Sequence, residues 1–236
     1  MSRDRVFAKS LSEVKAFEFN RAVTDVFNDM ISRSVPGYPL LLRLIGLYAA
    51  IFVQPGSRVY DLGCSLGEAS LIIAEQTGAR EPEIIAVDNS PAMIEKCRAR
   101  GSRVDWRCED IHQTEIANAS LVVLNLTLQF LQPDERGAML QRIFSGLNPG
   151  GVLVLSEKVV FDHALEDRRM VELHQAFKKS MGYSELEISQ KRSALEKVLV
   201  PDASALHLQR LREIGFAEIY QCFRCFNFVS YLAIRA

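Results

Sequence analysis

Strand-like apolar runs alternate with helix-like segments through the middle of this 236-residue chain. Five such runs occur at 58–63, 83–90, 103–111, 119–128 and 151–158, and a helical pattern follows most of them. Parallel strands need a long crossover between them, which is usually a helix. The alternation therefore predicts an α/β fold, in which helices cover both faces of a parallel sheet.

Three additions surround this alternation. Two helical stretches, Asn20–Ser34 and Leu40–Val53, precede the first strand, and a charged helical insertion covers about 161–200. After a further helix, Ser204–Ile214, the runs AEIYQCF and FNFVSYLAIR lie close enough to pair as a hairpin. We therefore expect a single domain over 1–236, with N-terminal helices at about 1–54 and the insertion before the last two strands. A mostly parallel seven-stranded sheet with an antiparallel C-terminal hairpin is the order of Rossmann-like class I methyltransferases.

Charge and cysteine content narrow the function classes. A net charge of −1 provides no basic surface for a phosphate backbone, so stable nucleic-acid binding is not expected. The N-terminus lacks the pattern of a signal peptide, and the apolar stretch Tyr38–Val53 is shorter than the roughly 20 residues of a membrane span. These features predict a cytoplasmic protein with no membrane partner. Five cysteines indicate no disulfide framework, and we expect Cys222 and Cys225 to be structural.

The stretch VYDLGCSLGEAS permits two interpretations. Gly63, Ser65 and Gly67 spell G-x-S-x-G, the elbow that presents a nucleophilic serine in α/β-hydrolases. A hydrolase is disfavoured because only one core strand precedes Ser65 and no HGGG-like loop lies upstream. An apolar strand that ends at Asp61 and enters a small-residue loop before a helix is instead typical of a nucleotide-like ligand site.

Polar residues at the next strand ends favour the ligand site. Asp88 lies at an offset suited to binding both ribose hydroxyls, while Asp110 and Ile111 suit an adenine amino group and ring face. Asn125 follows the fourth strand and can contact the same ligand. The loop lacks the G-x-G-x-x-G pattern of dinucleotide sites, so we favour S-adenosyl-L-methionine (SAM) and expect Asp61 to meet its ammonium group.

Several motifs together resemble the carboxy-S-adenosyl-L-methionine (carboxy-SAM) synthase family over essentially the whole chain. They include RSVPGY, VYDLGCSLGEAS, LNLTLQFL and GLNPGGVLVLSEK, and the most specific is GYSELEISQKR, which lies in the helical insertion. The resemblance implies that SAM and prephenate are converted to carboxy-SAM and phenylpyruvate. Carboxy-SAM would then supply a separate tRNA carboxymethyltransferase that modifies a wobble uridine. The ligand contacts that the resemblance implies are Tyr38, Gly63, Cys64, Ser65, Asp88, Asn89, Asp110, Ile111, Asn125 and Arg192.

The implied chemistry needs a fixed cation more than a nucleophile. A sulfonium makes its methyl hydrogens acidic, so the methyl carbon can capture carbon dioxide that prephenate releases. The resemblance makes Arg192 the catalytic partner of the new carboxylate, which a guanidinium can bind through two hydrogen bonds. No metal is expected. A conventional SAM-dependent methyltransferase and a non-enzymatic SAM-binding module are the alternatives, and the N-terminal helices and insertion could equally form a homodimer interface or cover the pocket.

Overall fold

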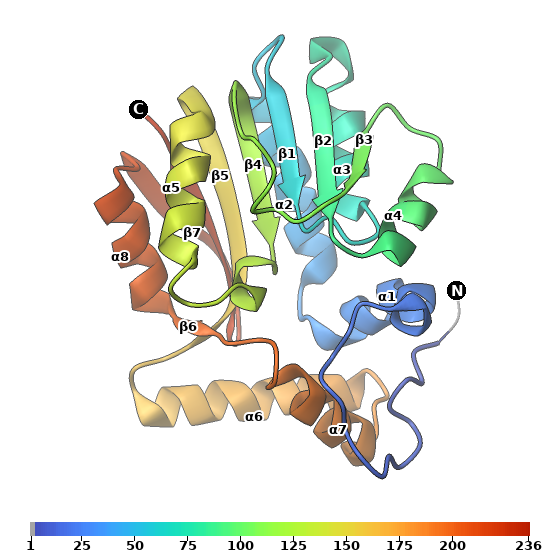
Figure 1. Cartoon of the computed structure of the whole chain (residues 1–236). Helices are drawn as coiled ribbons and strands as arrows, with labels where there is room; N and C mark the ends of the chain where they lie inside the picture. Colours follow the sequence, from blue (N-terminus) through green and yellow to red (C-terminus); the bar gives the residue numbers. More distant parts are fainter. Residues whose placement is uncertain (1–2) are drawn as a thin grey trace.

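The computed structural model describes residues 3–236, whose strands form one mixed sheet in the order β3-β2-β1-β4-β5-β8-β7 (Figure 1). β1 to β5 are parallel, whereas β8 runs antiparallel to both β5 and β7. The expected parallel sheet and terminal hairpin are thus confirmed. The strands are β1 (Arg58–Leu62), β2 (Glu83–Asp88), β3 (Asp105–Cys108), β4 (Ala119–Asn125), β5 (Leu147–Val160), β7 (Glu218–Cys225) and β8 (Phe228–Ile234).

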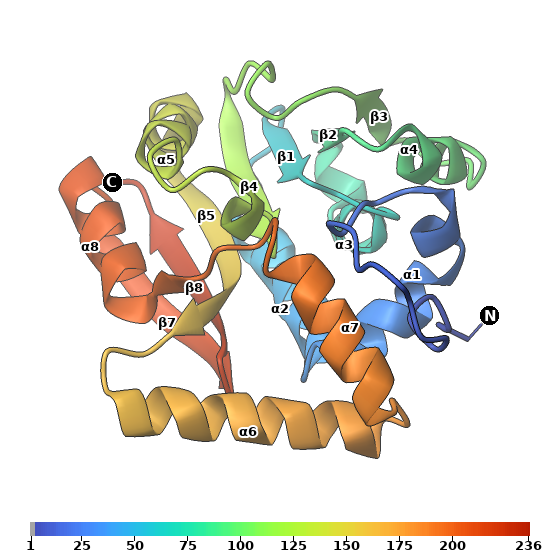
Figure 2. The same cartoon turned by 60° about the horizontal axis from the view of Figure 1, so that its bottom comes forward.

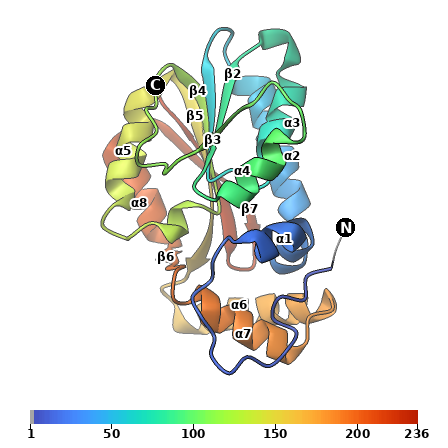
Figure 3. The same cartoon turned by 45° about the vertical axis from the view of Figure 1, so that its right-hand side comes forward.

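Helices cover both faces of this sheet (Figure 3). α2 (Tyr38–Phe52), α3 (Glu68–Gln76) and α4 (Pro91–Arg98) pack on one face, and α5 (Arg136–Gly146) and α8 (Ser204–Ile214) pack on the other. In β1, Val59 joins the core under the first group of helices, while Tyr60 and Leu62 join the core under the second. Burial on both faces explains why the central strands read as continuous apolar runs.

The remaining helices lie across the edge of the sheet where the parallel strands end (Figure 2). They are α1 (Arg21–Ser34), α6 (Ala164–Ser180) and α7 (Glu185–Leu195), so the insertion is helical as expected. Local sequence sets their starts: the Asn20 side chain accepts from Val23 N–H at α1, and Ser184 and Glu187 form a capping box at α7. Short 3₁₀ turns lie at Gly78–Arg80 and Leu128–Phe130.

An additional strand, β6 (Asp202–Ala203), was not expected from the sequence. It pairs in parallel with Val159 and Val160 at the end of β5. Two residues are too short to show a strand period, and the sheet therefore has eight strands rather than seven. β6 links the insertion to the sheet edge, next to the site described below.

Within residues 3–236, no single helix combines the length and apolar composition required to cross a bilayer. α1 and α2 meet those criteria only when taken together, and they are bent by 97° at the break between them.

Candidate active site

A cavity of ≈ 780 Å³ lies between the carboxyl ends of the parallel strands and helices α1, α6 and α7. Its walls include the loops after β1 to β4, the end of β5 and the N-terminal segment around Phe17 and Phe19. This volume suits a ligand of the size of a nucleoside derivative, and the carboxyl edge of the sheet is where open α/β folds bind ligands.

The loop after β1 needs its glycines. Gly63 and Gly67 have φ angles of 80° and 76°, in the left-handed region that other residues rarely adopt. A Cβ atom on Gly63 would lie 2.4 Å from Thr127 Oγ1. Gly63 and Ser65 both line the cavity. Cys64 does not line it, and its buried thiol lies beside Cys97, so contact with a ligand would have to come from its backbone.

Asp88 is held at the end of β2 by two backbone donors. Ser65 N–H donates to its Oδ2 at 2.9 Å, and Ser90 N–H donates to its Oδ1 at 2.9 Å. Burial raises the pKa of Asp88, and the two N–H groups oppose that shift. Each carboxylate oxygen keeps a free lone pair for a hydroxyl donor, and both Asp88 and Asn89 line the cavity.

Three further predicted residues lie along the same edge. Asp110 Oδ1 accepts from the backbone N–H of His112 at 2.9 Å, which is the largest cause of its lowered pKa. Ile111 is buried and offers an apolar surface, and Asn125 lines the cavity beyond it. Asn125 Oδ1 is buried without a hydrogen-bond partner in the described chain, so a donor from a ligand would satisfy it. These groups fit an adenosyl ligand with a free ribose.

Two expected contacts lie away from the cavity. Asp61 is 1% exposed, accepts from Ser70 Oγ at 2.5 Å and has its pKa raised to about 6 by burial. Its side chain does not line the cavity, and its contact with a ligand ammonium group stays a prediction. Tyr38 is also buried and packs with Val35 and Phe228, outside the cavity lining.

Arg192 lies on α7 and lines the wall opposite the sheet edge. Its Nε donates to Glu196 Oε1 at 2.5 Å, and both side chains are more than half exposed, at 55% and 58%. Within residues 3–236 its two Nη groups make no hydrogen bond, so the forked end of the guanidinium is available to a carboxylate.

Three lysines that were not predicted from the sequence line the same cavity: Lys158, Lys178 and Lys191. Lys158 is at the end of β5, and Lys178 is in the last turn of α6. A signal for Lys158 was present, because it follows an apolar strand run as Asp88 and Asn125 do. Lys178 carried no such signal, because its place depends on how α6 packs across the sheet edge.

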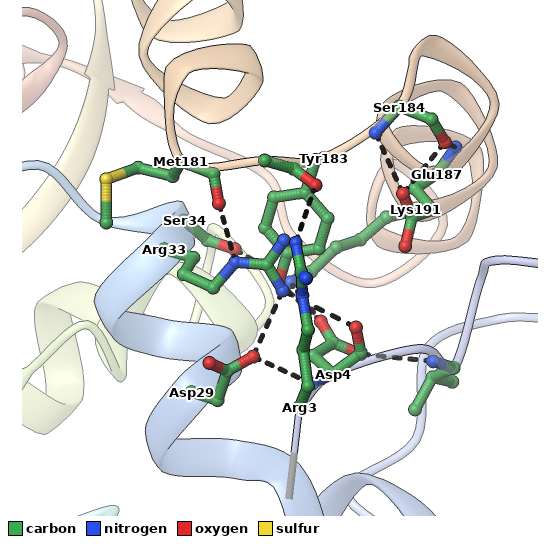
Figure 4. A network of polar contacts seen from close by, with 12 residues as sticks. Arg3, Asp4, Asp29, Arg33, Ser34, Met181, Tyr183, Ser184, Glu187 and Lys191 are labelled. Atoms are coloured by element: carbon green, nitrogen blue, oxygen red, sulfur yellow. Dashed lines mark hydrogen bonds and ion pairs between the residues drawn. The ribbon is translucent and has the colours of Figure 1, made fainter.

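A polar network fixes α7 to the N-terminal segment (Figure 4). Tyr183 O–H donates to Asp4 Oδ2, and the Arg33 guanidinium lies 3.9 Å above the centre of the Tyr183 ring. Lys191 Nζ donates to Ser34 Oγ at 2.8 Å and lies 3.7 Å from Asp4 Oδ2. Because Arg192 follows Lys191 directly, this network also fixes the helix backbone at Arg192. We call Lys158, Lys178, Lys191 and Arg192 the cationic wall of the cavity.

The geometry does not support a serine hydrolase. Ser65 N–H is bonded to Asp88, and the Ser65 side chain makes no hydrogen bond to a histidine anywhere in residues 3–236. A nucleophilic serine would need such a base within hydrogen-bond reach. The loop is therefore a ligand loop in this chain.

Comparison with known proteins agrees with this geometry. Residues 59–151 match a family model described as a methyltransferase domain. The structure of human N-acetylserotonin methyltransferase in complex with SAM superposes with a TM-score of 0.63 at 17% identity, covering 92% of this chain and 55% of that one. The fold is thus that of the class I SAM methyltransferases, and the chain contains a methyltransferase domain.

Two full-length relatives narrow this class. Carboxy-S-adenosyl-L-methionine synthase from Geobacter sp. (strain M21) is 51% identical, with 98% of each chain covered. The protein of the same name from Shewanella sp. (strain ANA-3) is 50% identical, with 99% of each chain covered. The chain belongs to the carboxy-S-adenosyl-L-methionine synthase family, which confirms the resemblance noted in its sequence.

Proposed function

We propose that this chain converts SAM and prephenate to carboxy-SAM and phenylpyruvate. The observation that carries the proposal is one cavity with two unlike walls. Asp88, Asp110 and Asn125 lie at one part of the sheet edge, whereas Lys158 ends β5 and Lys178 and Arg192 lie on the adjoining helical insertion. The acids that the insertion adds to the lining, Asp167 and Glu196, are already bonded to Phe161 N–H and Arg192. SAM carries a sulfonium and prephenate carries two carboxylates, so the division of charge suits this pair of substrates.

At the sheet edge, the proposed ligand contacts follow the geometry. Asp88 would accept from the two ribose hydroxyls, and Asp110 and Ile111 would contact the adenine. Asn125 would use its unsatisfied Oδ1. Gly63, Cys64 and Ser65 would contact the ligand from the loop after β1. The Tyr38 side chain is outside the cavity lining, so Tyr38 would contribute by packing against residues that line the cavity.

The reaction balances without a further reactant. Prephenate loses its ring carboxylate as carbon dioxide and its ring hydroxyl as hydroxide, which leaves phenylpyruvate. The SAM methyl group loses a proton, its carbon forms a bond to carbon dioxide, and the proton and hydroxide together make water. Arg192 would bind the new carboxylate through its free Nη groups and hold it near the methyl carbon.

The experiment is incubation of the purified protein with SAM, with and without prephenate, followed by mass spectrometry. The expected result is phenylpyruvate and a SAM derivative heavier by one carbon dioxide, formed only when prephenate is present. Transfer of a labelled methyl group to a metabolite or to tRNA would instead establish a conventional methyltransferase. SAM binding with neither product would leave a non-enzymatic binding module.

The proposal also covers the use of the product, the location of the chain and its oligomeric state. Carboxy-SAM would be consumed by a separate tRNA carboxymethyltransferase that modifies a wobble uridine. The chain would act in the cytoplasm. It would not bind nucleic acid stably, because a net charge of −1 provides no basic surface for a phosphate backbone. A homodimer would be tested by light scattering of the purified protein.

A further inference from the structure

Among the lysines of residues 3–236 that are not exposed, Lys158 and Lys178 are the two without an ion-pair partner, whereas Lys96 and Lys191 each have one. Neither ammonium group has a hydrogen bond or an ion pair within 4.0 Å among residues 3–236, although both side chains are half-buried in the cavity wall. By contrast, the adjacent Lys179 is exposed and lies 2.6 Å from Glu185. Leaving two cations half-buried and unpaired costs free energy that a bound anion would recover.

The surroundings of the pair are also positively charged. The pKa of Lys178 is lowered to about 8, first by burial and then by repulsion from Lys158 and Arg192. Burial and the same lysines hold the pKa of His174 at about 3, so its ring is neutral. Its Nε2 lies 2.8 Å from the Ser34 carbonyl and therefore donates to it.

The nearby acids are already engaged by other groups. Asp167 Oδ1 accepts from Phe161 N–H at 3.0 Å, and Glu196 accepts from Arg192. Lys191, the third lysine of the cavity, is held by Ser34 and lies beside Asp4 (Figure 4). The unneutralised charge is thus concentrated on Lys158 and Lys178, with the Arg192 fork beside them.

We propose that Lys158 and Lys178 form a binding subsite for the side-chain carboxylate that prephenate keeps when it becomes phenylpyruvate. This assignment rests on the proposed function. The other carboxylate of prephenate must leave as carbon dioxide, and cations placed on it would stabilise the ground state and slow its loss. The retained carboxylate has no such conflict, so binding it orients the ring without raising the barrier.

Two aromatic rings of the cavity lining offer an apolar surface for the substrate ring. Phe19 and Phe130 both line the cavity, with ring centres 5.4 Å apart in an edge-to-face arrangement. A six-membered ring packed against them would direct the side chain and the departing carboxylate, which share one ring carbon, to opposite faces of the ring. Asn227, whose Oδ1 is buried without a partner in the described chain, lines the cavity next to Phe228.

The test separates the two carboxylates. Protein saturated with S-adenosylhomocysteine, which has no reactive methyl group, is titrated calorimetrically with prephenate and, separately, with phenylpyruvate. Phenylpyruvate contains only the retained carboxylate. Lys158→Gln and Lys178→Gln should each weaken the binding of both ligands by about tenfold or more, with the affinity for S-adenosylhomocysteine unchanged.

Lys179→Gln is the matched control and should leave both affinities unchanged, because Lys179 points away from the cavity lining. Lys158→Arg and Lys178→Arg keep the charge and should retain binding within a few-fold, which covers the case in which a glutamine variant does not fold. Weaker prephenate binding with unchanged phenylpyruvate binding would overturn the proposal, since the lysines would then hold the departing carboxylate. Unchanged binding of both ligands would also overturn it.

The binding titrations test the lysine subsite independently of the proposed reaction. If wild-type protein makes no carboxy-SAM from SAM and prephenate, the proposed reaction fails. The titrations need no turnover, so they still decide whether Lys158 and Lys178 bind the carboxylate.

Discussion

Replacing Arg192 tests whether this side chain distinguishes carboxy-SAM from SAM. SAM has no carboxylate beside its sulfonium, whereas carboxy-SAM has one that the free Nη groups of Arg192 can bind. Arg192→Lys keeps the positive charge and loses the fork, and Arg192→Ala loses both. We expect both variants to bind SAM as the wild type does and to bind carboxy-SAM more weakly, with alanine the weaker.

The magnitude follows from the contacts of the side chain. Only Nε is engaged, by Glu196 at 2.5 Å, so two charge-assisted hydrogen bonds to a carboxylate are available. Such bonds to charged groups contribute about 1.5–3 kcal/mol each when shielded. Because the Arg192 side chain is 55% exposed, solvent screening reduces the combined contribution of the two hydrogen bonds to about 1–2 kcal/mol. Their loss should therefore weaken carboxy-SAM binding by roughly 5- to 30-fold.

The assay is paired calorimetric titration of SAM and carboxy-SAM against wild type and the two variants. Glu196→Gln is a useful control, because it removes the competing carboxylate and should alter carboxy-SAM binding by less than about 1 kcal/mol. Equal losses of affinity for SAM and carboxy-SAM would show that Arg192 has a general structural role and would refute the reasoning.

Three further predictions concern the same cavity. Asp88→Ala should weaken SAM binding by about 2–4 kcal/mol, and unchanged affinity in calorimetry would reject a ribose role for Asp88. Ser65→Ala should retain the fold and much of the activity, whereas inactivation by a serine-directed phosphonate in proportion to labelling of Ser65 would favour a hydrolase. Because the pKa of Lys178 is about 8, its positive charge is present below that pH and is lost above it. The KM for prephenate should therefore rise as the pH increases through about 8, and Lys178→Arg should flatten that rise; an unchanged profile in the arginine variant would contradict the assignment.

The sequence predicted the sheet well because the relevant signals are local. Apolar runs buried on both faces mark the parallel strands, and the helix Ser204–Ile214 has the same bounds in the structure. The cluster of Asp88, Asp110 and Asn125 could be predicted from the sequence for a similar reason. Parallel strands end at one edge, so residues that follow them lie together without any knowledge of tertiary packing.

Side-chain direction and long-range packing could not be predicted from the sequence in this way. Cys64 and Tyr38 belong to motifs that border the cavity, yet both side chains lie outside its lining. Asp88 ends β2, whereas Asp61 lies one residue before the end of β1, where Ser70 and the surrounding core bury it. Neither difference is encoded in residue spacing, because each depends on which neighbour the chain brings against that position.

The cationic wall shows why the insertion, rather than the shared sheet edge, distinguishes this cavity. A methyl transfer from SAM needs an acceptor near the methyl carbon and has no general need for a cation there. Four cations line the cavity: Lys178, Lys191 and Arg192 come from the insertion, and Lys158 comes from the adjoining end of β5. Lys158 and Lys178 have no ion-pair partner in the described chain, which is costly unless an anion binds them. The contacts of Tyr183 with Asp4 and of Lys191 with Ser34 hold the insertion against α1 and the N-terminal segment. Cations on and beside the insertion, with carboxylates after β2 and β3, favour one relative orientation of a cationic and a dianionic substrate. On this reasoning, Arg192 of the family-specific motif GYSELEISQKR would bind the new carboxylate, and the loop after β1 would bind the nucleoside. Lys158 and Lys178, which lie outside that motif, would bind the second substrate.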